Sequence, residues 1–245
     1  DSADDGTYMA GGMTLIPTLK QRLASPSDVI DLGSIADLGG ITVDGDTVTI
    51  GAMTCHADVA ASAEVKKAIP ALAHLASLIG DPQVRNRGTI GGSIANNDPA
   101  ADYPGALVGL GATVHTTTKT VSADEFFTGM FETALDEGEL VTKVSFPIPE
   151  SAAYQKFPNP ASRYAVVGAF VAKTKDGIRV AITGAGPTVF RVPEMELALT
   201  ASFTPEAIAD NTVPADNLNG DLHATAEYRA HLIGVMAKRA VADCA

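Results

Sequence analysis

Cysteine is almost absent from this sequence. Among 245 residues only Cys55 and Cys244 occur, and they lie far apart. Neither belongs to a C-x-x-C pair, so the chain encodes no disulfide framework and no zinc or iron–sulfur site of its own. This use of cysteine is typical of a protein that stays in a reducing cytoplasm.

Aromatic residues are also scarce. They make up 5% of the chain and include no tryptophan, whereas hydrophobic residues make up 46%. The core must therefore consist mostly of alanine, valine, isoleucine and leucine, which suits a fold that contains both helices and strands. The length allows one large domain or two modest ones.

Cationic side chains are outnumbered, with 17 lysines and arginines against 29 aspartates and glutamates and a formal net charge of −12. Nucleic-acid binding depends on cations that neutralise phosphates, so this balance argues against a nucleic-acid partner. No apolar run approaches the ~20 residues that span a bilayer, and the opening residues DSADD lack the cationic start of a signal peptide. We therefore expect no transmembrane segment.

Turn signals and hydrophobic periodicity predict the elements of the first part of the chain. Helices are predicted at 18–24, at 70–79 between Pro70 and Gly80, and from the capping-box pattern at Ser122 to Glu125. The predicted strands are 28–35, 41–52 as a hairpin around Asp44-Gly45, 106–117 and 140–149.

A proline-rich stretch separates the two parts of the chain. Residues 147–160, PIPESAAYQKFPNP, hold four prolines, which makes this stretch the best candidate for a domain boundary. Beyond it, residues 165–186 are predicted to form two long strands around Lys175-Asp176-Gly177. Helices are predicted near 193–201, 205–210 and 225–242.

Two short glycine segments are suited to holding a phosphate. They are Ala10-Gly11-Gly12-Met13-Thr14 and Thr89-Ile90-Gly91-Gly92-Ser93, and each joins a glycine pair to a hydroxyl residue. Glycine permits positive φ, so that successive backbone N–H groups converge on an anion without cationic side chains. Either pair alone could equally serve a tight turn. The two together favour a dinucleotide diphosphate.

Other familiar nucleotide-binding, metal-binding and catalytic motifs are absent from the sequence. After Gly184-Ala185-Gly186 the third glycine position of a dinucleotide fingerprint is Val189, and no G-x-x-x-x-G-K-[ST] run exists. The histidines have no metal-binding spacing, and no G-x-S-x-G elbow occurs. We expect a structural or surface role for each of them, and no catalytic residue in this chain. The histidines are His56, His74, His115, His223 and His231.

The two glycine segments, in this order, resemble those of the FAD-binding medium subunit of the molybdenum hydroxylases. Within the xanthine dehydrogenase family, the closest resemblance is to the medium subunit of carbon monoxide dehydrogenase. AGGMTLIP is similar to the family's first diphosphate loop, and VRNRGTIGGS to its second, with Ser93 in place of a more usual asparagine. NNDPAADYP, SRYAVVG and AEYRAHL extend the resemblance over nearly the whole chain.

The resemblance implies an α+β fold with an FAD-binding domain of the vanillyl-alcohol-oxidase (PCMH-like) type in two subdomains. A C-terminal three-stranded sheet with packed helices follows. We expect the FAD-binding domain at 1–149, with subdomains at about 1–33 and 34–149, and the C-terminal domain at 150–245. Relatives carry a strand and a helix before the first glycine loop, so the N-terminal part is expected to be cut short here.

The resemblance also assigns residues to FAD. The diphosphate is expected at Ala10, Gly11, Gly12, Met13, Thr14, Leu15, Thr89, Ile90, Gly91, Gly92 and Ser93. Asp102 is expected near the ribose or ribityl hydroxyls, Tyr164 against the isoalloxazine ring, and Lys156 or Leu140 at its pyrimidine side. Alternatively, Tyr164 is a half-buried strand residue, and Asp98 belongs only to an Asn-Asp-Pro turn.

The implied function is electron transfer. FAD would accept electrons from [2Fe–2S] clusters of a small subunit and pass them to an external acceptor, while a large subunit carries molybdenum and the substrate site. The resemblance suggests a dimer of heterotrimers, either cytoplasmic or peripheral at the inner membrane face. Two alternatives are a stand-alone flavin oxidoreductase and a non-enzymatic nucleotide-binding protein. Carbon monoxide, an aldehyde and an N-heterocycle all stay open as substrates.

Overall fold

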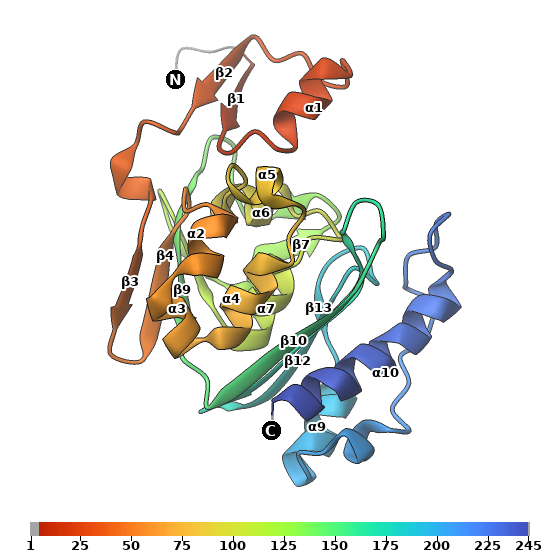
Figure 1. Ribbon diagram of the computed structural model, residues 1–245. Helices are drawn as coiled ribbons and strands as arrows, with labels where there is room; N and C mark the ends of the chain where they lie inside the picture. Colours follow the sequence, from red (N-terminus) through yellow and green to blue (C-terminus); the bar gives the residue numbers. More distant parts are fainter. Residues whose placement is uncertain (1–4, 245) are drawn as a thin grey trace.

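The computed structural model describes residues 5–244 and has an α+β fold (Figure 1). The expected domain limits at residues 1 and 245 lie outside the described residues. None of the helices within 5–244 is long and apolar enough to cross a membrane.

The chain begins with a small unit that carries the first glycine segment. Its strands β1 (Gly6–Met9) and β2 (Asp28–Asp31) pair in parallel, and the crossover between them contains α1 (Leu15–Lys20). This helix starts three residues earlier than the predicted range of 18–24. It stops early because Arg22 adopts a left-handed φ of 59°. No residue of α1 is buried, so the unit has little core of its own.

A five-stranded antiparallel sheet in the order β3-β4-β9-β5-β6 forms the centre. The 41–52 hairpin is confirmed as β3 and β4, and the strand predicted at 140–149 is confirmed as β9. The strands are β3 (Ile41–Asp44), β4 (Thr47–Gly51), β5 (Thr113–Thr116), β6 (Thr120–Ser122) and β9 (Val141–Pro147). The neighbouring helices are α2 (His56–Ala61), α3 (Ala63–Ala68), α4 (Pro70–Ser77), α5 (Pro82–Arg85), α6 (Ile90–Asn96) and α7 (Tyr103–Leu110).

The prediction of a strand over 106–117 is wrong in its first half, because residues 103–110 form α7. All eight residues of this helix are buried, so the segment shows no amphipathic periodicity that could distinguish a helix from a buried strand. Gly111, at φ 64°, ends the helix, and β5 follows.

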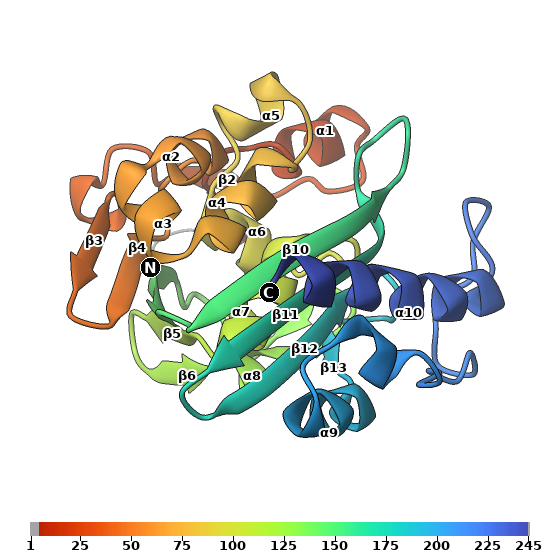
Figure 2. The same ribbon diagram turned by 60° about the horizontal axis from the view of Figure 1, so that its bottom comes forward.

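The C-terminal sheet joins two hydrophobic cores. It is formed by β10 (Ser151–Pro158), β11 (Ala165–Thr174), β12 (Gly177–Thr183) and a two-residue fourth strand, β13 (Phe190–Arg191), which the predicted three-stranded sheet lacked. Tyr154, Phe170 and Ala172 face the core beneath α4 and α7. Val171 and Val180 face the core beneath α9 (Pro193–Ala201) and α10 (Ala226–Asp243). Figure 2 shows α10 lying along β10 and β11.

The remaining elements are short. The helix predicted at 205–210 is a 3-10 helix, η2. The others are the 3-10 helix η1 (Ala36–Leu38), α8 (Ala123–Phe126), β7 (Phe127–Gly129) and β8 (Glu132–Thr133), with η2 covering Pro205–Ile208. In the predicted capping box, the Ser122 hydroxyl bonds the Glu125 carboxylate at 2.6 Å and not the backbone.

Candidate functional site

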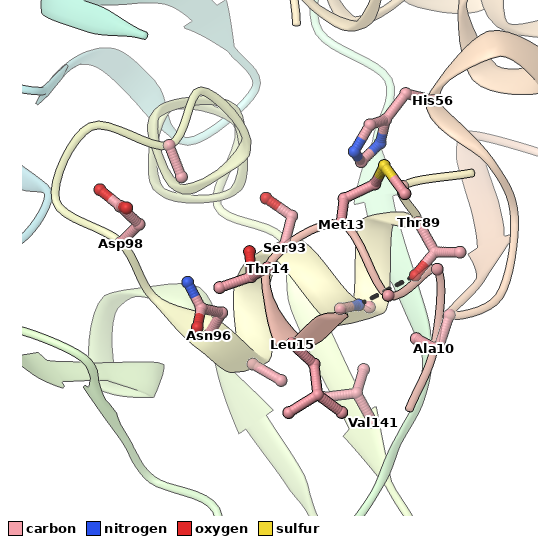
Figure 3. A pocket seen from close by; sticks show the side chains of 18 of the residues that line it. Ala10, Met13, Thr14, Leu15, His56, Thr89, Ser93, Asn96, Asp98 and Val141 are labelled. Carbon is pink, nitrogen blue, oxygen red and sulfur yellow. Dashed lines mark hydrogen bonds between the residues drawn. The ribbon is translucent and has the colours of Figure 1, made fainter. Parts of the chain in front are cut away.

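A cavity of about 570 Å³ lies where the N-terminal unit meets α6 and the loop that leads into β11. Figure 3 shows part of its lining. Both predicted glycine segments face this one cavity, although they lie far apart in the sequence. Most of the lining residues fall within 10–15, 88–93, 95–102, 135–141 and 162–164.

The first glycine segment is a loop whose backbone donors are unused. Within residues 5–244, the N–H groups of Ala10 to Leu15 have no protein acceptor. The carbonyls of Gly12 and Thr14 accept instead from Ile16 and Thr18 of α1. Gly12 adopts φ 75°, a conformation that side chains rarely permit. A run of unpaired N–H groups beside a cavity fits an anionic group such as a diphosphate.

The second glycine segment is arranged differently, because it is the first turn of α6. Thr89 caps this helix and accepts the Gly92 N–H with its side chain at 3.2 Å. The N–H groups of Ile90 and Gly91 bond the carbonyls of Thr54 and Ala52 at 3.1 and 2.8 Å, and the Ser93 N–H bonds the Thr89 carbonyl. The expectation that backbone donors of this segment point at a diphosphate is therefore wrong for residues 90–93.

Glycine in the second segment has a packing role. A Cβ on Gly91 would lie 2.5 Å from the Cβ of Ala52, which is a buried residue. Ile90 is fully buried and is not among the residues that line the cavity. The lining from this segment consists of Thr89, Gly91, Gly92 and Ser93.

The two segments are packed directly against each other. A Cβ on Gly11 would lie 1.9 Å from the Arg87 carbonyl oxygen, and one on Gly92 would lie 3.3 Å from the Ala10 Cβ. Because Gly11 meets only backbone atoms, no side chain can be added at this position without moving the first segment away from Arg87 and Gly88. Arg85 helps to shape this region, since its guanidinium donates to the carbonyls of Ile79 and Gly80 at 3.0 and 3.1 Å.

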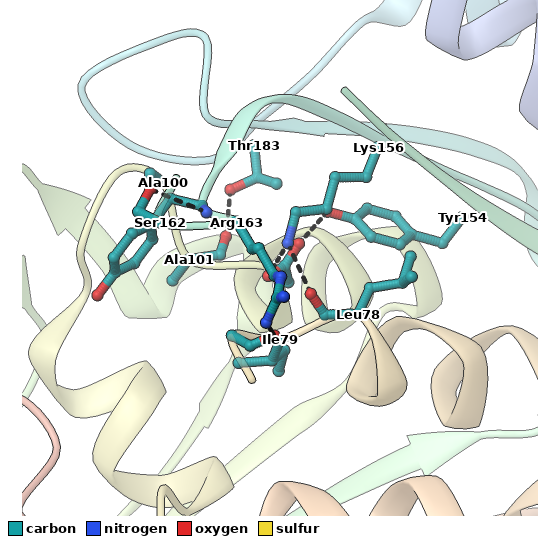
Figure 4. A network of polar contacts seen from close by, with 12 residues as sticks. Leu78, Ile79, Ala100, Ala101, Tyr154, Lys156, Ser162, Arg163 and Thr183 are labelled. Carbon is teal, nitrogen blue, oxygen red and sulfur yellow. Dashed lines mark hydrogen bonds and ion pairs between the residues drawn. The ribbon is translucent and has the colours of Figure 1, made fainter. Parts of the chain in front are cut away.

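A buried ion pair contributes Asp102 to another part of the cavity lining, and Figure 4 shows the polar contacts around it. The Lys156 ammonium lies 2.8 Å from one carboxylate oxygen of Asp102, and the Tyr154 hydroxyl donates to the other at 2.5 Å. The two charged side chains are only 3% and 4% exposed. Lys156 also donates to the Leu78 carbonyl at 3.1 Å, which ties β10 to the end of α4. Burial raises the pKa of the Asp102 carboxyl, and its two partners oppose that rise.

A second buried carboxylate fixes the segment that carries Leu140. Glu139 accepts from the hydroxyls of Thr116 and Thr118 and from the Asp136 N–H at 2.8 Å, and it lies 3.2 Å from the Lys119 ammonium. Burial of Glu139 works against its ionisation, but these donors together lower its pKa to about 2. The neighbouring Leu135, Leu140 and Val141 form an apolar part of the lining.

Comparisons with known proteins bear directly on this arrangement. Residues 1–149 match the FAD-binding domain in molybdopterin dehydrogenase, and residues 152–244 match the C-terminal domain of the carbon monoxide dehydrogenase flavoprotein. The chain belongs to the FAD-binding subunits of the molybdenum hydroxylase family.

Several relatives of this family are similar over almost the whole chain. The carbon monoxide dehydrogenase medium chain of Hydrogenophaga pseudoflava is 38% identical, over 97% of this chain and 88% of that protein. The nicotine 6-hydroxylase medium subunit of Paenarthrobacter nicotinovorans is 35% identical, over 98% and 90% respectively. A solved carbon monoxide dehydrogenase from Hydrogenophaga pseudoflava superimposes with a TM-score of 0.90, covering 99% of this chain and 91% of that one. The fold is therefore the PCMH-like one that the resemblance implied.

The structure places the remaining expected FAD residues of this molybdenum hydroxylase subunit as follows. Leu140, Asp102 and Tyr164 line the cavity, whereas Lys156 is not among the lining residues and lies in the ion pair. Both carboxylate oxygens of Asp102 already have partners, which leaves less capacity for sugar hydroxyls than expected. Tyr164 is 47% exposed and directly precedes β11. Asp98 forms the expected turn, accepting the Ala100 N–H at 2.8 Å, and also faces the cavity.

His56 is a cavity residue that the sequence did not reveal. It is 4% exposed at the start of α2, lines the cavity, and appears above Met13 in Figure 3. Burial, aided by the charge of Arg85, lowers its pKa to about 4, so the ring is neutral at physiological pH. A lone histidine among apolar residues gives no sequence signal, because only the fold brings it beside the second glycine segment.

Proposed function

We propose that this chain binds FAD non-covalently in the 570 Å³ cavity and transfers electrons within a molybdenum hydroxylase complex. The observation that carries the proposal is the row of N–H groups from Ala10 to Leu15 that have no acceptor within residues 5–244, on a loop whose Gly11 packs against the backbone that leads into the second glycine segment. When bound, the flavin supplies the redox chemistry.

Different lining residues contact different parts of the cofactor. The N–H groups of residues 10–15 donate to the diphosphate, aided by the hydroxyls of Thr14 and Ser93, which face the cavity in Figure 3. Gly91 and Gly92 keep the second segment close to the first. Asp102 and Lys156 act as one buried unit that fixes the wall, while Leu140 and Tyr164 offer apolar and aromatic surface to the isoalloxazine ring.

The electrons come from [2Fe–2S] clusters on a small partner subunit and leave to an external acceptor such as a quinone. Support for this comes from the names of the relatives, which are medium chains or medium subunits of dehydrogenases and hydroxylases. With only two cysteines, this chain cannot ligate such a cluster itself. A large partner carries molybdenum, and the complex is a dimer of heterotrimers in the cytoplasm or at the inner membrane face.

The substrate is oxidised on the large subunit, and this chain does not fix its identity. Relatives of similar identity, at 38% and 35%, are named for carbon monoxide and for nicotine. The flavin subunit therefore tolerates a change of substrate chemistry elsewhere in the complex. We also propose the domain division at residues 149 and 150, with subdomains at about 1–33 and 34–149.

The test is isolation of the native complex through a tag on this chain. We expect two further polypeptides, iron and molybdenum, and a flavin band near ~450 nm that disappears when the complex is reduced. Flavin without iron or molybdenum partners would contradict the electron-transfer role and favour a stand-alone flavin enzyme. A complex that contains iron and molybdenum but releases no FAD on denaturation would contradict FAD binding.

A further inference from the structure

Two polar side-chain atoms beside the cavity have no hydrogen-bond partner within residues 5–244. Among the described residues, His56 Nδ1 and Tyr103 Oη are buried side-chain atoms without a hydrogen bond. Their rings pack together with centroids 5.3 Å apart, and the two side chains are 4% and 0% exposed. An unsatisfied buried polar atom costs about 1–3 kcal/mol, so two of them on adjacent side chains call for a shared explanation.

The possible partners around Tyr103 are limited. The Asp102 carboxylate is already engaged by Lys156 and Tyr154. The Cys55 thiol is directed at the carbonyls of Asn86 and Arg87. Burial raises the pKa of the Tyr103 hydroxyl, so this group stays protonated and needs an acceptor. The neutral imidazole of His56 has one acceptor nitrogen to offer.

We infer that the Tyr103 hydroxyl donates to one buried water, which donates in turn to His56 Nδ1, and that this link fixes His56 as the Nε2–H tautomer with its N–H donor directed at the cofactor diphosphate. A neutral imidazole carries one hydrogen, so an acceptor role at Nδ1 requires a donor role at Nε2. Tyr103 is the positioning residue, and His56 is the residue that touches the ligand.

The surroundings of the ring indicate which part of the cofactor it meets. A Cβ on Gly88 would lie 2.6 Å from His56 Nε2, so this edge of the ring packs against the loop between α5 and α6 that leads into the second glycine segment. Gly11 of the first glycine segment packs against the carbonyl of Arg87, the residue that precedes Gly88. The Nε2 edge thus lies at the junction of the two segments. The N–H groups of residues 90–93 already bond acceptors within the protein. His56 therefore provides a donor that the second segment lacks.

This inference rests on the proposed FAD function, and the experiment separates the two. FAD affinity is measured by flavin fluorescence quenching on the full chain stripped of cofactor, for the wild type and for His56→Phe, His56→Gln and Tyr103→Phe. We expect FAD binding to weaken about ten- to hundredfold in His56→Phe, because one hydrogen bond to a charged group is lost. Glutamine should restore most of the affinity, because its amide supplies an N–H near the Nε2 position.

A second readout reports the tautomer without any ligand. Long-range 1H–15N correlation spectra distinguish Nε2–H from Nδ1–H imidazoles, and the resonance missing in His56→Gln identifies His56 among five histidines. We expect the Nε2–H form in the wild type and a mixture in Tyr103→Phe. An Nδ1–H form in the wild type, or unchanged FAD affinity in a folded His56→Phe, would overturn the inference. Failure of the wild type to bind FAD would instead refute the proposed function.

Discussion

The contact between the two glycine segments can be tested by adding a single methyl group at Gly11. An alanine Cβ at this position would lie 1.9 Å from the Arg87 carbonyl oxygen, 2.6 Å from its carbon and 2.9 Å from Gly88 Cα, where an ordinary contact begins at 3.4 Å. All three atoms belong to the backbone, so no rotamer change can relieve the overlap. Gly11 does not have a left-handed φ, so the effect of Gly11→Ala is purely steric.

The expected result is a displaced first loop. The segments must move apart by more than an ångström, which removes at least two N–H groups from the diphosphate. Each hydrogen bond to a charged group is worth about 1.5–3 kcal/mol, so a loss of about 3 kcal/mol or more is expected. This corresponds to FAD binding that is weaker by about a hundredfold or more.

The assay is equilibrium titration of the cofactor-free protein with FAD, alongside circular dichroism to establish folding. Gly39→Ala is the matched control, because its Cβ would meet nothing closer than the Ala36 carbonyl at 3.8 Å, outside the cavity. We expect wild-type affinity in this control. A folded Gly11→Ala protein that bound FAD as tightly as Gly39→Ala would refute the two-segment site.

Two further predictions concern the buried charges at the cavity wall. Lys156→Met leaves the Asp102 carboxylate buried and unpaired, so we expect the free energy of unfolding to fall by about 3–5 kcal/mol in urea denaturation. Adding Asp102→Asn should recover part of that loss, and equal stability of Lys156→Met and wild type would contradict the pairing. Glu139 has its pKa lowered to about 2 from the ordinary 4.5, so its stabilisation is complete above pH 4.5 and is lost as the pH falls towards 2. Thermal unfolding between pH 2 and 6 should therefore show a smaller acid-induced drop in Glu139→Gln, and parallel curves for the two proteins would exclude this role.

The sequence by itself determined the type of protein, because its strongest signals are local. A glycine pair with a hydroxyl residue, the Asp44-Gly45 turn and the proline-rich stretch at 147–160 depend on backbone preferences of neighbouring residues. The same holds for the long strands β11 and β12 and for helices α9 and α10, whose turn and capping residues set their limits. Among these signals, the two glycine segments indicated the family and are the segments that share the cavity.

The tertiary structure decided the features that depend on residues far apart in the chain. The fully buried α7 was mistaken for a strand because burial on all sides removes the periodicity that marks a helix. Whether an N–H group is free depends on distant acceptors. Only the fold shows that the carbonyls of Ala52 and Thr54 accept from residues 90–91, while the N–H groups of residues 10–15 find no acceptor within residues 5–244. The pairing of Asp102 with Lys156 and the place of His56 beside Gly88 arise in the same way, from elements that meet only after folding.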